Sequence, residues 1–147
     1  MFHRSQLQKL NFRPLNHVIM KYYFEKTLSN IDFDSAIERV IESLKNEGFG
    51  ILTEIDVKAT MKKKLDEDFR PYKILGACNP PYAFKALQAE EKIGAMLPCN
   101  VIVQQKGDNI AIAAVDPVAS MQAIQNQDLS EIAMEIRAKL QSVINNL

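Results

Sequence analysis

The chain contains two cysteines, Cys78 and Cys99, and each is followed directly by an asparagine. Cys78 ends an apolar stretch that begins at Tyr72, and a sequence typical of a helix start comes directly after it. Because the positive end of a helix dipole favours a thiolate, this position predicts a lowered pKa for the Cys78 thiol. Cys99 follows Pro98 at the start of a second apolar segment. If the two segments are neighbours, they form a candidate thiol site with Cys78 as a nucleophile, a redox thiol or a ligand for a soft metal.

A second interpretation of the two cysteines stays open, because free cysteine is among the residue types most often buried as a small apolar side chain. Twenty residues separate the two cysteines, so the paired Cys-x-x-Cys spacing of a zinc module is missing and no metal site is predicted. Both histidines, His3 and His17, lie in the first 19 residues. Ser-His and Cys-His mechanisms are therefore excluded for the rest of the chain, which leaves thiol, carboxylate and lysine chemistry. Whether the protein binds a cofactor stays unknown from the sequence.

Three predicted strands end in a short polar side chain that is suited to cap a helix, namely Asp56, Asn79 and Asp116. Such a side chain accepts a hydrogen bond from an unpaired backbone N–H, and capping alone is the simpler explanation of these residues. If the three strand ends share one edge of the sheet, the helix starts beside them could also bind a small ligand. Lys64, in the helix after Asp56, and Asn100, after the second cysteine, complete the candidate ligand-binding residues.

Apolar periodicity predicts the elements that would position these side chains. A strand is expected over residues 22–28 and a helix capped by Asp32 or Asp34 that ends at Gly48. The following elements are a strand over 49–56, a helix over 57–65, a strand over 72–78, a helix over 80–92, strands over 101–103 and 110–115, a short helix from 117 and a helix capped by Asp128. In the helix over 80–92, Ala83, Phe84 and Leu87 are expected to face inward. Both faces of the strand over 110–115 are apolar, so both are expected to be covered.

Composition fits a single soluble domain of 147 residues, with 47% hydrophobic and 24% charged residues. The 18 basic residues equal the 18 acidic ones, and the lysines over 58–64 lack interleaved aromatic residues, so nucleic acid is not an expected partner. No apolar run approaches the roughly 20 residues that span a membrane. Two cysteines form no disulfide framework, which favours the cytoplasm. Residues 1–19 are basic and free of acids, so they are expected to be a poorly ordered extension or, alternatively, a targeting presequence.

Several motifs over about residues 20–147 carry a resemblance to a known family. They are Gly48-Phe-Gly-Ile-Leu-Thr-Glu-Ile-Asp56, Phe69-Arg-Pro-Tyr-Lys-Ile-Leu-Gly-Ala-Cys-Asn-Pro80, Leu97-Pro-Cys-Asn-Val101 and Asp116-Pro117. In order and spacing this region resembles the domain of unknown function family 302 (DUF302). The resemblance implies an α+β domain of two layers, with a curved, mainly antiparallel sheet packed against helices, and a homodimer. It implies no activity. The elements expected from periodicity give the order β-α-β-α-β-α-β-β-α-α.

Two functions are therefore expected as alternatives, and the sequence leaves open whether the protein is an enzyme. In the first, a small cytoplasmic domain binds a small-molecule ligand, or performs thiol-dependent chemistry, near Cys78 and Cys99. In the second, the domain is a non-catalytic dimeric interaction module, and both cysteines are core packing residues. Solvent access to the two thiols distinguishes these alternatives.

Overall fold

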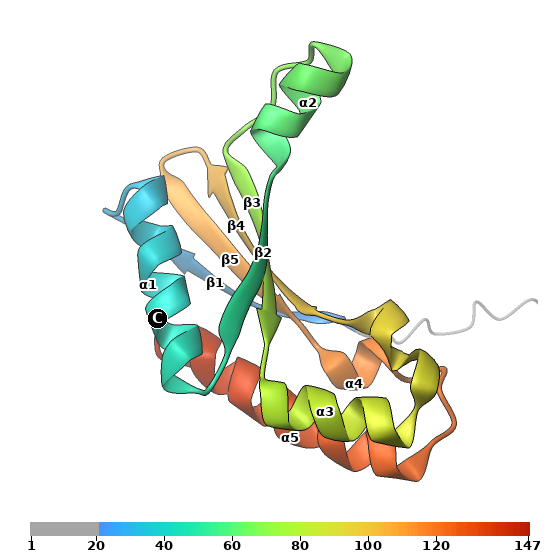
Figure 1. Ribbon diagram of the computed structural model, residues 1–147. Coiled ribbons are helices and arrows are strands. Elements are labelled where there is room, and N and C mark those ends of the chain that lie inside the picture. The colour runs from blue at the N-terminus through green and yellow to red at the C-terminus, as the bar shows by residue number, and fades with distance from the viewer. Residues whose placement is uncertain (1–20) are drawn as a thin grey trace, which may run out of the picture.

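The computed structural model describes residues 21–147, so the predicted extension over 1–19 lies outside the described residues. Five strands form one sheet in the order β1-β5-β4-β3-β2, and every neighbouring pair is antiparallel. The strands are β1 (Tyr23–Leu28), β2 (Gly50–Asp56), β3 (Tyr72–Cys78), β4 (Cys99–Lys106) and β5 (Asn109–Val115). The helices are α1 (Phe33–Asn46), α2 (Val57–Leu65), α3 (Pro80–Ala89), the short 3₁₀ helix η1 (Glu91–Met96), α4 (Pro117–Ser120) and α5 (Gln127–Asn145). The predicted α+β class and element order are confirmed (Figure 1).

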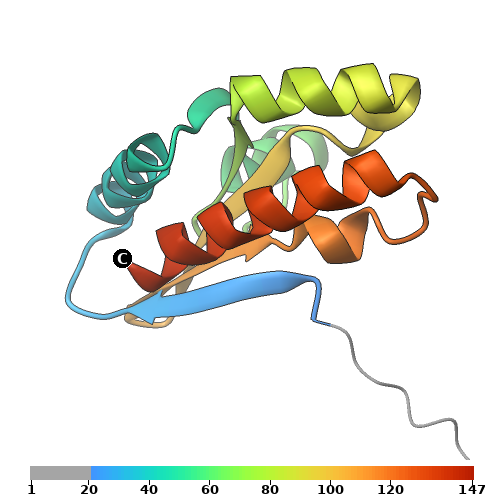
Figure 2. The same cartoon turned by 90° about the horizontal axis from the view of Figure 1, so that it is seen from below.

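Helices α1 and α5 pack against one face of the sheet and bury it (Figure 2). In β5 this face carries Ile110, Ile112 and Ala114, each fully buried. The inward faces of the two helices follow the 3.6-residue period that the sequence predicts for α5. Their buried side chains are Ala36, Ile37, Val40 and Leu44 of α1, and Leu129, Ala133, Ile136, Leu140, Val143 and Ile144 of α5.

The opposite face of the sheet is not covered, so the prediction that both faces of β5 are covered is wrong. Within residues 21–147 no helix packs across this face. Register places Ile55, Ile74, Ile102 and Ala113 side by side in one row across four strands. These side chains range from half-buried to exposed, with Ile55 48% exposed. The second face of β5 is apolar because it carries small alanines, although no helix lies over it. The pattern of apolar residues in a strand does not show whether another element covers that face.

Short polar residues cap the helices as predicted, but in α5 the capping residue is a different one. Asp32 caps α1, and its carboxylate accepts hydrogen bonds from the backbone N and the Oγ of Ser35, each at 2.8 Å. The N-cap of α5 is Asn126 and not the predicted Asp128, because Asn126 Oδ1 accepts from the backbone N–H groups of Asp128 and Leu129. Asp128 stands in the first helical turn, where a negative charge also suits the helix dipole.

Helix α3 ends at Ala89, and η1 continues from Glu91, so the predicted single helix over 80–92 is divided. The expected inward residues of α3 are also partly wrong. Phe84 is 63% exposed and Leu87 46% exposed, whereas Ala86 is the buried side chain and Ala83 is half-buried. Helix α3 packs against α5 through a narrow strip of small side chains. The large side chains of Phe84 and Leu87 lie beside this strip and stay exposed.

Candidate functional site

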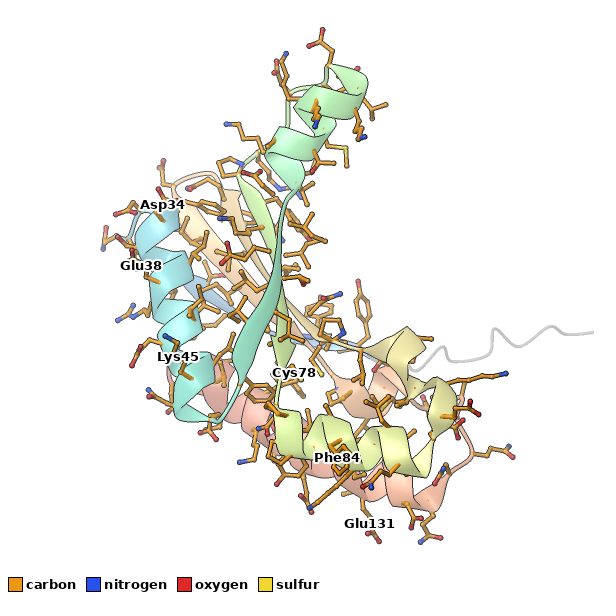
Figure 3. All side chains as sticks on the ribbon, viewed as in Figure 1. Asp34, Glu38, Lys45, Cys78, Phe84 and Glu131 are labelled. Atoms are coloured by element: carbon orange, nitrogen blue, oxygen red, sulfur yellow. The ribbon has the colours of Figure 1, made fainter. Side chains whose placement is uncertain are left out.

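An apolar cavity of about 370 Å³ lies where β3 ends and β4 begins. Both cysteines line it, so the structure brings the two Cys-Asn turns to one site. The other walls come from the β2 segment, α3, the end of η1 and α5, and they include Phe49, Leu52, Ala86, Leu97, Ile132 and Ile136. Figure 3 shows Cys78 at the point where the sheet meets α3. The side chains of Leu52 and Leu87 are largely exposed and mark the rim of the cavity.

Among residues 21–147, two polar side chains other than the thiols line this cavity, Asn79 and Tyr82. Asn79 Nδ2 donates to the backbone carbonyl of Glu47 at 3.2 Å. The neighbouring Glu135 carboxylate raises the pKa of the half-buried Tyr82 hydroxyl. Among the described residues, no Asp, Glu, Lys, Arg or His lines the cavity. An ionised group inside would therefore have no counter-charge, and burying such a group costs far more than burying an apolar one.

The two thiols are protonated at neutral pH. Burial raises the pKa of Cys78 above its ordinary value of 9.0. Burial, and then the neighbouring Cys78, raise the pKa of Cys99 to about 11. The predicted lowering at Cys78 is therefore wrong. Pro80 and Pro81 occupy the first two positions of α3, so this helix start has no N–H there to donate to a thiolate, and desolvation decides the direction.

The raised pKa of Cys99 predicts a loss of stability at high pH. The unfolded chain releases this proton near pH 9, and the folded protein holds it up to about pH 11. The contribution of Cys99 to folding is therefore complete below about pH 9 and is lost as the pH rises toward 11. Urea unfolding at about pH 8 and at about pH 10.5 should show a larger loss for the wild type than for Cys99→Ala. Equal losses would contradict the burial of this thiol.

Asn79 does not cap α3, although it stands at the N-cap position. An N-cap side chain accepts from the second or third helical N–H, and the second residue here is a proline. The Asn79 amide turns instead to the loop after α1, where it binds the Glu47 carbonyl. Gly48, at a φ of 86°, lies so close that a Cβ there would be 3.1 Å from Asn79 Nδ2. Asn79 thus ties the loop between α1 and β2 to the cavity wall.

Asp56 and Lys64 do not belong to this site. Strands β3 and β5 run parallel to each other and end at the cavity edge, but β2 runs in the opposite direction. The six steps from Gly50, beside Cys78, to Asp56 span roughly 20 Å at about 3.3 Å per residue. Asp56 caps α2 there by accepting from the Ala59 N–H at 2.9 Å, as the sequence predicts. Helix α2, which carries Lys64, has no buried residue and projects from the body of the domain (Figure 1).

Asp116 and Asn100 lie near the cavity edge but do not line the cavity. The Asp116 side chain is 9% exposed. It accepts from the Val118 N–H at 3.0 Å and from Arg137 Nε at 3.1 Å, so its oxygens serve the start of α4 and an ion pair. Asn100 pairs with Gly76 and is exposed on the uncovered sheet face. Of the five candidate ligand-binding residues, only Asn79 lies at the cavity.

The comparisons with known proteins agree with this fold. The family model described as "Domain of unknown function DUF302" matches residues 24–147. The chain belongs to the DUF302 family. A crystal structure of an uncharacterized conserved DUF302 protein from Bacillus stearothermophilus is similar, with a TM-score of 0.79 and 31% sequence identity over 86% of this chain and 98% of that one. No curated protein matches the chain. DUF302 membership confirms the resemblance and assigns no activity.

Sequence reasoning missed most of the walls of this DUF302 cavity. The inward residues of α5 were expected to cover the sheet, and Ile132, Ala133 and Ile136 also face the cavity. Met121 and Tyr82 carried no signal, because one lies in a short polar segment and the other follows two prolines. No helix within residues 21–147 has the length and apolar character needed to span a membrane.

Proposed function

We propose that this DUF302 protein binds a small, uncharged and largely apolar ligand in the cavity beside Cys78 and Cys99. The observation that carries this proposal is the cavity itself. Its volume of about 370 Å³ falls within the range of roughly 300–1,000 Å³ that is usual for small-molecule sites. Its walls are almost entirely apolar, no ionised side chain of the described residues lines it, and the Asn79 amide is already hydrogen-bonded, so the cavity favours an apolar ligand over an ion.

The two thiols contribute soft, apolar contact surface to this proposed site. A thiolate is the reactive form of cysteine, and burial disfavours it at both positions. The raised pKa values of the two thiols therefore favour ligand binding over the nucleophilic or redox role that the sequence suggested for Cys78. Both cysteines are free, which fits a reducing cytoplasm as the proposed location.

Titration with the uncharged dye N-phenyl-1-naphthylamine tests the proposal, because its fluorescence increases in apolar surroundings. We expect saturable binding by the wild type. Ala83→Phe should weaken that binding at least tenfold, about 1.4 kcal/mol, because the ring would fill the cavity from α3. Gln88→Phe is the matched control, since Gln88 is exposed on the same helix and does not line the cavity. Equal weakening by both variants, or no binding by the wild type, would refute the proposal.

A second candidate function, a homodimeric interaction module, is favoured by the uncovered sheet face. The row formed by Ile55, Ile74, Ile102 and Ala113 presents apolar side chains across four strands. Exposed apolar surface rimmed by polar residues is a feature of protein–protein interaction sites. The proposed occupant is a second copy of the chain, because a two-fold axis can bring the apolar row of one copy onto the same row of its partner.

Sedimentation equilibrium tests the dimer. The wild type should have twice the 16.7 kDa mass of one chain, and Ile102→Glu should have the mass of one chain. A charge at this position would be buried without a partner in the dimer and solvated in the monomer. Met134→Glu places the same charge on an exposed position of α5 and should leave the mass at that of the wild type. A monomeric wild type would rule out this candidate.

A further inference from the structure

A second hollow of about 200 Å³ lies beside the cavity, between α4 and the first turns of α5. Three side chains, Met121, Leu129 and Ala133, line both the cavity and this hollow. They therefore form the partition between the two spaces. No Asp, Glu, Lys, Arg or His lines either space within the described residues. The hollow is lined by Gln122 and Ser130 beside its apolar side chains, and neither of these two carries a charge. An uncharged ligand thus meets no ionised side chain on either side of the partition.

The three partition residues differ in how firmly they are held. Leu129 and Ala133 belong to α5 and are 1% and 3% exposed, so they move only with the helix. Leu129 also packs with Ala86 and Ile93 in a separate apolar cluster. Met121 follows the last residue of α4 in the segment between two helices, and it is half-buried. Its unbranched side chain has three rotatable bonds and adapts to irregular spaces. Met121 also packs against this cluster, but only from its edge as a partly buried residue. A rotamer change at Met121 therefore opens the partition without a change in the backbone.

We propose that the ligand is an unbranched aliphatic chain that runs from the cavity past Met121 into the second hollow. This inference rests on the proposed ligand-binding function and adds the class of ligand and the residue that limits its length. A rigid ring system fits only within one space, whereas a flexible chain passes a partition that a single side chain opens. Met121 is therefore a specificity-determining residue, and its size sets the longest chain that gains further affinity.

A series of unbranched primary alcohols from six to sixteen carbons, displacing N-phenyl-1-naphthylamine, tests the inference. Affinity for the wild type should rise about fourfold for each added carbon, from the roughly 0.8 kcal/mol of a buried methylene group, until the chain fills the available length. In Met121→Phe this rise should stop several carbons earlier, while the shortest alcohols bind as they do to the wild type. In Met121→Ala it should continue to a longer chain.

Gln125→Phe is the matched control, because Gln125 is exposed in the same segment and lines neither space. It should keep the wild-type limit. The same limit in the wild type, Met121→Phe and Met121→Ala would overturn the role of Met121 while leaving ligand binding intact. If Met121→Phe does not fold, the opposite shift expected of Met121→Ala decides the matter alone. A wild type that binds neither the dye nor any alcohol refutes the proposed function itself, and with it this inference.

Discussion

Replacement of Leu140 by alanine is expected to lower the free energy of unfolding by about 2–5 kcal/mol, the largest change that we predict. Leu140 lies on the inward face of α5, has no exposed surface and belongs to the main core cluster between α1, α5 and the sheet. The change removes buried apolar atoms and leaves a cavity that the surrounding rigid elements fill only in part. The substitution removes contacts between α5 and the sheet.

Equilibrium urea unfolding, followed by circular dichroism, measures this difference. Met134→Ala is the matched control, because Met134 lies on the same helix and is 64% exposed. Its effect should stay within about 0.5 kcal/mol, as is usual for surface positions. A loss below about 1 kcal/mol for Leu140→Ala would contradict the packing of α5 on the sheet.

The second large effect is expected at Gly76, where alanine should lower the free energy of unfolding by about 1–3 kcal/mol. A Cβ at this position would overlap Thr53 Oγ1 and would lie 2.8 Å from Pro98 Cγ. Gly76 is not among the glycines with positive φ in the described residues, so the expected cost comes from crowding and not from the backbone conformation. Because residue 76 has no side chain, Thr53 of β2 and Pro98 before β4 can pack directly against the backbone of β3.

A double-mutant cycle with Thr53→Ala separates this crowding from other effects. Thr53 is exposed, so Thr53→Ala alone should change stability little. Combined with Gly76→Ala it should recover part of the loss, with a coupling energy of about 0.5–3 kcal/mol. Gly50→Ala is the control, because a Cβ there would meet nothing within 4 Å. Additive effects of Gly76→Ala and Thr53→Ala would contradict the overlap.

Local chemistry made much of the fold predictable from the sequence. Asp56 stands directly before α2, whose bounds agree with the prediction, because a capping side chain and a change of period mark the same point. The long apolar stripe of α5 needs burial wherever the helix lies, so its role in the core was also predictable. The uncovered sheet face was missed, since Ala111, Ala113 and Val115 are apolar whether or not a helix lies above them.

The candidate site was harder to predict, because it depends on the directions of the strands and on how deeply each side chain is buried. Cys78, Asn79 and Cys99 meet at the cavity since β3 ends where its antiparallel neighbour β4 begins. Asp56 was grouped with them because it also ends a strand, but β2 runs the other way. The pKa of Cys78 depends on its burial and on the missing N–H groups of two prolines. The prediction from the sequence considered only the helix dipole and therefore had the wrong direction.

The narrow attachment of α3 has a consequence for how the protein moves. Helix α3 buries only Ala86, whereas α5 buries six side chains, and α3 forms one wall of the cavity. Segments with few buried contacts open locally at a lower free energy than the rest of a domain. Amide hydrogens of α3 should therefore exchange with solvent faster than those of α5, and an occupant of the cavity should slow them. The helix that encloses the cavity is then also the one expected to open for the proposed ligand.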